Sequence, residues 1–95
     1  RDYKSYFPIS VTRIREGNEE AIPVKSVEVG DRLIIRNQEL IPVDAILMNG
    51  TGQVDYSFVT GESDVIEKES GEHLFAGGRQ MGQKVEIEVI AYKPE

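Results

Sequence analysis

The segment Lys84-Val85-Glu86-Ile87-Glu88-Val89 decides the fold class, because apolar and charged residues alternate along it. Alternation places Val85, Ile87 and Val89 on one face, which is typical of a half-buried β-strand. Other segments that are rich in β-branched or apolar residues and bounded by turn formers are expected to be strands as well. They are Val11–Arg15, Ala21–Val24, Arg32–Arg36, Asp44–Met48, Gln53–Asp55 and His73–Ala76.

Turn-forming residues separate these segments at a spacing that suits a small sandwich or a distorted barrel. The sequence therefore predicts an all-β domain, and we expect the last two glycine pairs below to lie in hairpin turns. The turn formers are Glu16-Gly17-Asn18, Val29-Gly30-Asp31, Ser70-Gly71-Glu72, Asn49-Gly50-Thr51-Gly52 and Gly77-Gly78.

Two segments depart from the strand pattern. Tyr3, Tyr6 and Phe7 have the spacing of one helical face, which indicates the end of a helix, and Pro8 would stop it. We therefore predict that residues 1–8 are the remnant of a helix or linker and that residues 9–95 form the domain. The stretch Ser57–Lys68 lacks clean alternation and is predicted to be an exposed loop with a short turn of helix.

Composition excludes several classes of protein. The chain has 95 residues, enough for one domain, with 11 Lys and Arg against 17 Asp and Glu and a net charge of −6. No basic cluster is present to follow a phosphate backbone, so we expect no nucleic-acid partner. Cysteine is absent, which removes redox and thiol-nucleophile chemistry. No apolar run approaches the roughly 20 residues that a membrane-spanning helix needs.

The tetrapeptide Thr60-Gly61-Glu62-Ser63 is the strongest candidate for chemistry. Gly61 lacks a Cβ atom, so the backbone can approach a phosphoryl group closely and present the Glu62 carboxylate to it. The hydroxyl groups on either side can hold the turn through side-chain to backbone hydrogen bonds. On these four residues alone, an ordinary polar turn is the favoured interpretation, because such tetrapeptides are common by composition.

The tetrapeptide belongs to a longer ordered set of motifs: Val29-Gly30-Asp31, Ile41-Pro42-Val43-Asp44, Val54-Asp55-Tyr56-Ser57, Thr60-Gly61-Glu62-Ser63, Glu67-Lys68, Gly71-Glu72 and Ala76-Gly77-Gly78. This set resembles the actuator domain of P-type ATPases. The compact spacing is most similar to the heavy-metal subgroup, which includes copper transporters. Two departures are visible: members of the family often have Leu or Met where Val59 stands, and a proline soon after the tetrapeptide, where this chain has Asp64-Val65-Ile66.

The resemblance implies a distorted jelly-roll-like β-sandwich on the cytoplasmic side of an integral membrane pump, with residues 1–8 leading to a membrane segment. The partners it implies are the phosphorylation and nucleotide-binding domains of the same longer chain, and the isolated fragment is expected to be a monomer. ATP and Mg²⁺ are expected on those other domains, with no cofactor or metal in this one. The transported ion is set by groups among the membrane helices, so copper is implied by the subgroup alone.

The resemblance also implies roles for the tetrapeptide in hydrolysing an aspartyl phosphate carried by the phosphorylation domain. Glu62 would orient the attacking water and partly deprotonate it, which is a sufficient contribution because this reaction needs mainly positioning and charge stabilisation. Thr60 and Gly61 would shape the loop, and Ser63 would brace it.

Two other functions remain open from the residues. One is a non-catalytic β-barrel interaction module in which the tetrapeptide is only a turn, and the other is a self-sufficient hydrolase that uses Asp55, Glu62 and Asp64. Asp44 and Asp55 lie near turns and are expected to bond to the backbone rather than to an ion. His73 is the only histidine, so it has no partners for a ligand cluster and is expected to be an ordinary strand residue.

Overall fold

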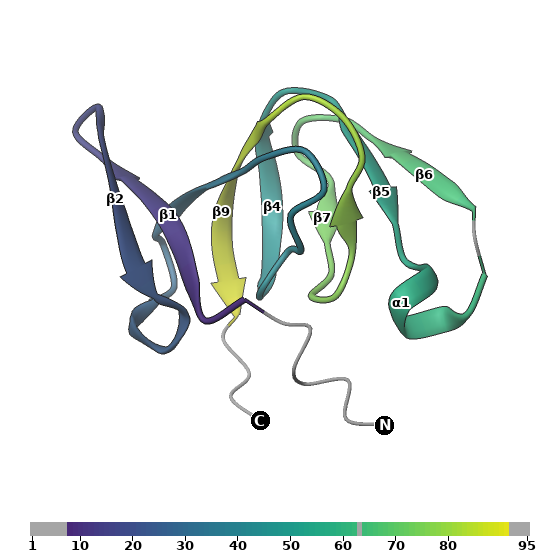
Figure 1. Ribbon diagram of the computed structural model, residues 1–95. Coiled ribbons are helices and arrows are strands. Elements are labelled where there is room, and N and C mark those ends of the chain that lie inside the picture. Colours follow the sequence, from purple (N-terminus) through teal and green to yellow (C-terminus); the bar gives the residue numbers. More distant parts are fainter. Residues whose placement is uncertain (1–7, 63, 92–95) are drawn as a thin grey trace.

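A computed structural model describes residues 8–62 and 64–91, which form two antiparallel sheets (Figure 1). The larger sheet has six strands in the order β2-β1-β3-β9-β4-β7, and the smaller has three in the order β6-β5-β8. A 3₁₀ turn, η2 (Val24–Ser26), follows β2, and one turn of helix, α1 (Ser57–Thr60), follows β5. The strands are β1 (Ser10–Arg15), β2 (Asn18–Pro23), β3 (Arg32–Ile35), β4 (Asp44–Asn49), β5 (Gly52–Asp55), β6 (Val65–Lys68), β7 (His73–Leu74), β8 (Arg79–Gln80) and β9 (Val85–Ala91).

Strand β9 lies at the centre of the large sheet, between β3 and β4, as its alternation requires. Val85, Ile87 and Val89 are buried at 3%, 0% and 0% exposure. The intervening glutamates lie on the opposite face, where the Arg32 guanidinium bonds to Glu86 at 2.8 Å and to Glu88 at 3.1 Å. The predicted half-buried strand is confirmed, with its polar face paired to a neighbouring strand.

The hydrophobic core lies between the two sheets and contains side chains from both. Leu33 and Leu47 of the large sheet and Val54 of the small one are all fully buried. The polar side chain of Gln80, in β8, is buried with them. Both the oxygen and the nitrogen of its amide form hydrogen bonds. Gln80 Oε1 accepts from the backbone N–H of Gln53 at 3.1 Å, while Nε2 donates to the carbonyl of Gln83 at 2.7 Å. These bonds offset the desolvation of the amide, so the small sheet stays joined to the neighbouring loop.

All the strands predicted from sequence are present, and the all-β fold is confirmed. Two further strands were not predicted. The first, β6, falls within the stretch predicted to be a loop; its residues Val65 and Ile66 are 50% and 45% exposed, and it is held by backbone pairing with β5. The second, β8, has only two residues, Arg79 and Gln80. Neither strand has the one-sided burial that produces apolar alternation, so neither leaves a signal in the sequence.

The expectation of hairpin turns at two glycine pairs is wrong. Gly50 separates β4 from β5, and Gly77-Gly78 separates β7 from β8, and in both cases the two strands belong to different sheets. These turns are therefore corners at which the chain crosses from one sheet to the other. The predicted helix remnant at residues 1–8 lies, apart from Pro8, outside the described residues, and the boundary at residue 9 stays a prediction.

Candidate functional site

The candidate site is the connection from β5 to β6, which carries α1 and then Gly61 and Glu62 (Figure 1). Thr60, Gly61 and Glu62 are all exposed to solvent. Ser63, the last residue of the predicted catalytic tetrapeptide, lies outside the described residues. The structure thus places the glutamate where a reacting group on a partner can reach it.

Local hydrogen bonds explain why the chain turns at this point. The Asp55 side chain closes the turn between β5 and α1, because its Oδ1 accepts from the backbone N–H of Ser57 at 2.8 Å. The same bond stabilises the charged carboxylate and lowers the pKa of Asp55. Gly61 ends α1 in the left-handed conformation, at φ +82°, and its N–H donates to the carbonyl of Ser57 at 2.8 Å. This is the usual use of glycine after a helix, since other residues adopt that conformation with strain.

The Thr60 side chain connects the helical turn to Glu62. Its Oγ1 donates to the carbonyl of Tyr56 at 3.2 Å and accepts from the backbone N–H of Glu62 at 3.1 Å. A residue with no hydroxyl at this position would make neither bond. The shaping role predicted for Thr60 and Gly61 therefore has a geometric basis, while their part in catalysis stays a prediction.

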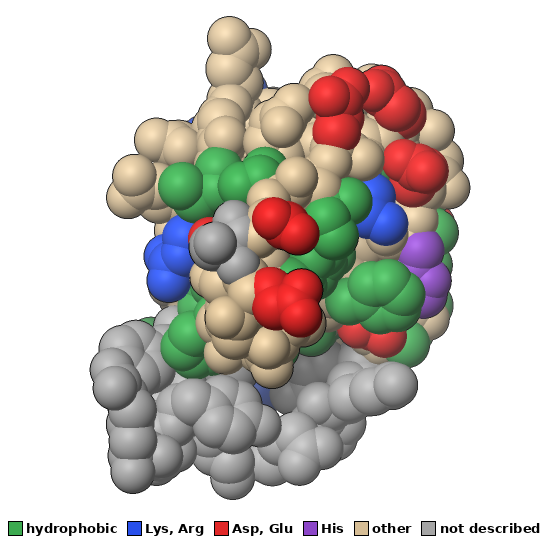
Figure 2. Space-filling model, turned by 90° about the vertical axis from the view of Figure 1, so that its right-hand side faces the viewer, with side chains coloured by type: hydrophobic (Ala, Val, Ile, Leu, Met, Phe, Trp, Pro, Cys, Tyr) green, Lys and Arg blue, Asp and Glu red, His purple; other side chains and the backbone are tan. Residues whose placement is uncertain are grey.

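An open hollow of about 560 Å³ lies beside this turn. Three of its apolar side chains are unusually exposed for their size: Val59 at 52%, Ile66 at 45% and Phe75 at 49%. Figure 2 looks onto this end of the molecule and shows hydrophobic side chains beside acidic ones, with the histidine at the margin. The lining residues are Tyr56, Val59, Thr60, Glu62, Asp64, Ile66, Lys68, Phe75 and Ala76.

The connection from β7 to β8 forms the far side of the hollow and is itself fixed. Asp44 Oδ1 accepts from the backbone N–H of Ala76 at 3.0 Å, and the N–H of Ile41 donates to the carbonyl of Gly78 at 2.7 Å. The predicted backbone-bonding roles of Asp44 and Asp55 are both confirmed. Sequence reasoning included the Ala76-Gly77-Gly78 motif but did not predict that it would face the Thr60–Glu62 turn.

The comparisons with known proteins now decide the family. The family model of the P-type ATPase actuator domain matches residues 5–95. The chain belongs to this family. It is 39% identical over 83 residues to the copper-exporting P-type ATPase B of Enterococcus hirae, covering 86% of this chain and 11% of that protein. It is 44% identical over 62 residues to a probable copper-exporting P-type ATPase of Archaeoglobus fulgidus, covering 65% of this chain and 8% of that protein.

The fold agrees with the sequence match. A crystal structure of a zinc-transporting PIB-type ATPase in the E2.Pi state superposes with a TM-score of 0.88 at 28% identity, covering 94% of this chain and 15% of that one. The actuator-domain chain thus spans about a tenth of the length of the curated relatives it matches. Between residues 8 and 91, with Ser63 set aside, the structure contains no helix long and apolar enough to cross a membrane.

His73 of the actuator domain lies in β7, as predicted, and stacks on Phe75 with ring centroids 4.3 Å apart. Its Nε2 is buried and makes no hydrogen bond within the described residues. In that same part of the chain, no three or more His, Cys, Asp or Glu side chains gather as a metal site.

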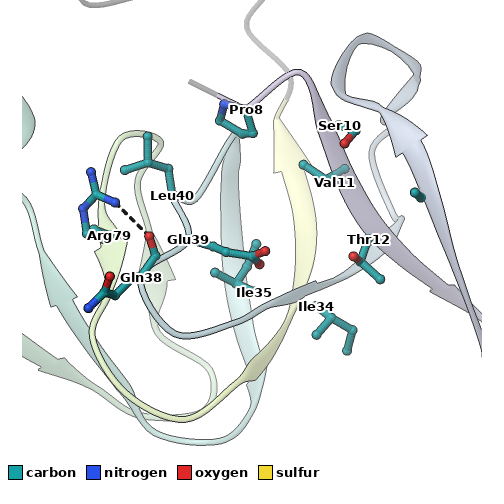
Figure 3. Close-up of a pocket in the computed structure, with 11 residues that line it drawn as sticks. Pro8, Ser10, Val11, Thr12, Ile34, Ile35, Gln38, Glu39, Leu40 and Arg79 are labelled. Atoms are coloured by element: carbon teal, nitrogen blue, oxygen red, sulfur yellow. Dashed lines mark hydrogen bonds between the residues drawn. The ribbon is translucent and has the colours of Figure 1, made fainter. Parts of the chain in front are cut away.

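A second hollow, of about 260 Å³, lies on another face of the actuator domain (Figure 3). It is bounded by β1 and by the connection from β3 to β4, and it shares no residue with the hollow beside Glu62. Its two charged side chains are already bonded within the domain, because Arg79 donates to the carbonyl of Gln38 at 2.8 Å and Glu39 accepts from the N–H of Arg36 at 2.8 Å. Both charged groups therefore contribute hydrogen bonds to the fold at this hollow.

Proposed function

We propose that this actuator domain promotes hydrolysis of an aspartyl phosphate located elsewhere in a longer chain, with Glu62 as the catalytic residue. The observation that carries the proposal is the Glu62 turn itself. The glutamate is exposed, yet its backbone N–H is bonded to Thr60 Oγ1 and the end of the helical turn is closed by Gly61. An accessible carboxylate on a backbone turn that is fixed by hydrogen bonds suits a group that acts on a docked partner.

The proposed reaction asks little covalent chemistry of this domain. A water oxygen attacks phosphorus in line, the bond from phosphorus to the aspartate oxygen breaks, and the proton of the water passes to the Glu62 carboxylate. The products are inorganic phosphate and a free aspartate. Orientation of the water and acceptance of its proton are the contributions that a positioned carboxylate makes to phosphoryl transfer. Ser63 is proposed to brace the turn on its other side.

The partners are proposed from the family and from the share of the relatives that this chain spans. They are the phosphorylation and nucleotide-binding domains of the longer chain, which would hold ATP and Mg²⁺, and the membrane helices to which residues 1–8 would lead. The domain would lie on the cytoplasmic side. The relatives named above are copper exporters and one similar structure is a zinc transporter, so we propose a heavy-metal cation, copper, as the transported ion. Stimulation of phosphorylation by Cu⁺ and not by Zn²⁺ in the full-length protein is the expected result.

The test of the proposed reaction is steady-state turnover of the full-length protein carrying Glu62→Gln. The variant keeps the size and hydrogen-bonding capacity of the side chain but cannot accept the proton. It should still take phosphate from ATP, accumulate the phosphoenzyme, and turn over roughly 10²–10⁴-fold more slowly. Glu28→Gln, at an exposed glutamate before β3, is the matched control and should turn over normally. Normal turnover by Glu62→Gln would end the proposal.

Titration of the 95-residue domain with ATP distinguishes this function from the self-sufficient hydrolase. The sequence has no phosphate-binding loop with its lysine, so neither binding nor phosphate release is expected. The measurement is calorimetry with phosphate release followed in parallel. Micromolar affinity or steady release above the blank would favour the hydrolase.

A further inference from the structure

Tyr56 connects the Glu62 turn to the β7–β8 connection, and no role is assigned to it by the family match. It lies between β5 and α1, is half-buried, and packs against the hydrophobic core. Its phenol oxygen accepts from the backbone N–H of Phe75 at 3.0 Å, and its ring meets the Phe75 ring edge to face at 6.3 Å. Burial raises the pKa of the phenol, so the hydroxyl keeps its proton at neutral pH.

The backbone of the same residue holds the helical turn. The Tyr56 carbonyl accepts from the N–H of Val59 at 2.9 Å, from the N–H of Thr60 at 2.9 Å, and from Thr60 Oγ1 at 3.2 Å. Thr60 Oγ1 in turn accepts from the N–H of Glu62. A continuous path of bonds therefore runs from Phe75 through Tyr56 and Thr60 to the glutamate.

The space for the Tyr56 ring depends on the absence of a side chain at Gly78. A Cβ atom at this glycine would lie 2.7 Å from Tyr56 Cε1 and 2.5 Å from Val54 Cγ1. Both distances are too short for real carbon contacts, so any side chain at position 78 would displace the ring or the strand. The absence of a side chain at Gly78 thus leaves room for the Tyr56 ring beside the corner between the two sheets.

We propose that Tyr56 is a positioning residue for Glu62: it ties the turn that carries the glutamate to the fixed β7–β8 connection. This inference rests on the proposed function and adds to it the part of the fold that aims the carboxylate. The phenol supplies the bond that crosses from one connection to the other, and the carbonyl transmits its position to Thr60. Loss of the phenol leaves the fold intact and leaves Glu62 present but less well aimed.

The test compares Tyr56→Phe, Glu62→Gln and the double variant in the full-length protein. Tyr56→Phe keeps the ring and removes only the bond to the Phe75 N–H. We expect phosphoenzyme decay to slow about three- to tenfold, in line with the loss of one hydrogen bond that orients a reacting group. Phosphorylation by ATP and the KM for ATP should not change. In the Glu62→Gln background the same substitution should have no further effect, because the group that it positions is gone.

Ile22→Val controls for a general loss of stability. Ile22 is buried at 8% exposure in β2, away from the turn. The control should lower the melting temperature by a few degrees, as is also expected of Tyr56→Phe, and leave decay at the wild-type rate. Decay at the wild-type rate in Tyr56→Phe, or slowing that persists in the double variant, overturns the inference. Normal decay in Glu62→Gln instead overturns the proposed function, so the two failures are distinguishable.

Gly78→Ala gives a second test that changes neither the Tyr56 residue nor the sequence of the turn, and acts through the contact of the added Cβ atom with the Tyr56 ring. By displacing the ring, it should slow decay at least as much as Tyr56→Phe and speed amide exchange at Glu62 in the 95-residue domain. If Gly78→Ala folds and leaves both the decay rate and the exchange rate at wild-type values, the ring does not position the turn and the inference is wrong.

Discussion

The central sheet and the Glu62 turn are held by different kinds of interaction. In β9, Ile87 and Val89 are fully buried and their strand is paired on both sides. In the turn, Val59 is 52% exposed and order comes from short-range hydrogen bonds around Thr60 and Gly61. The sheet therefore provides stability through burial, whereas the turn provides an accessible carboxylate at little cost to stability. The predictions below test this division, from the largest effect expected in the domain to the smallest.

Amide hydrogen exchange should differ most between the two regions. The N–H of Ile87 lies in a central buried strand and is expected to exchange only on global unfolding. The N–H groups of Gly61 and Glu62 lie in an exposed turn and should open locally. We expect exchange on the order of 10³-fold faster, or more, for these two amides in the 95-residue domain. Equal protection of Glu62 and Ile87 would show the turn to be a packed structural element.

Truncation of a core side chain should destabilise the domain strongly. Leu47 of β4 is fully buried, so Leu47→Ala removes apolar burial and leaves a cavity. We expect the free energy of unfolding to fall by about 2–5 kcal/mol, measured by urea titration. Ile90→Ala, at a position 38% exposed in β9, is the control and should lose less than about 1 kcal/mol. Similar losses in both variants would contradict the placement of the core.

Removal of the Asp55 carboxylate should have a smaller effect that depends on pH. Asp55→Ala loses the bond to the Ser57 N–H, which we expect to lower the free energy of unfolding by about 1 kcal/mol at neutral pH. The pKa of Asp55 is lowered in the fold, so its contribution is complete above the ordinary aspartate pKa of about 3.9 and is lost as the pH falls through the folded value. The difference between wild type and Asp55→Ala should therefore shrink below about pH 4. A difference that stays constant to pH 2 would show that the carboxylate charge is not responsible.

The sequence predicted the parts of the fold that are buried on one face. β9 alternates because its two faces meet the core and Arg32. The turn at Glu16-Gly17 was recognisable because Gly17 adopts a positive φ of 79°, a conformation that glycine favours. β6 and β8 were missed because their order comes from pairing with β5, a long-range relation that no local pattern contains. The corners at Gly50 and Gly77 were mistaken for hairpins because a glycine turn has the same local sequence in both cases.

The sequence identified the tetrapeptide that carries Glu62 but not the contacts that support it, and the catalytic role of Glu62 stays a prediction. Glu62 and Thr60 stand in a recognisable motif, and the structure gives Thr60 the hydroxyl contacts that such a turn needs. The contact between Tyr56 and Phe75 joins residues 19 positions apart. That contact depends on the path of β6 and β7 between them, so it becomes visible only when the two sheets are assembled.

The measurement that tests the account most directly is the decay of the radiolabelled phosphoenzyme in Glu62→Gln after a chase with unlabelled ATP. Thermal melts of the wild-type and variant domains accompany it. An exposed turn carboxylate should change the free energy of unfolding by no more than about 0.5 kcal/mol, the smallest effect in this series. Decay should nevertheless slow by roughly 10²–10⁴-fold, because the attacking water loses the group that orients it and takes its proton. Decay at the wild-type rate in a well-folded variant would contradict the account, and a large loss of stability would show that Glu62 has a structural role instead.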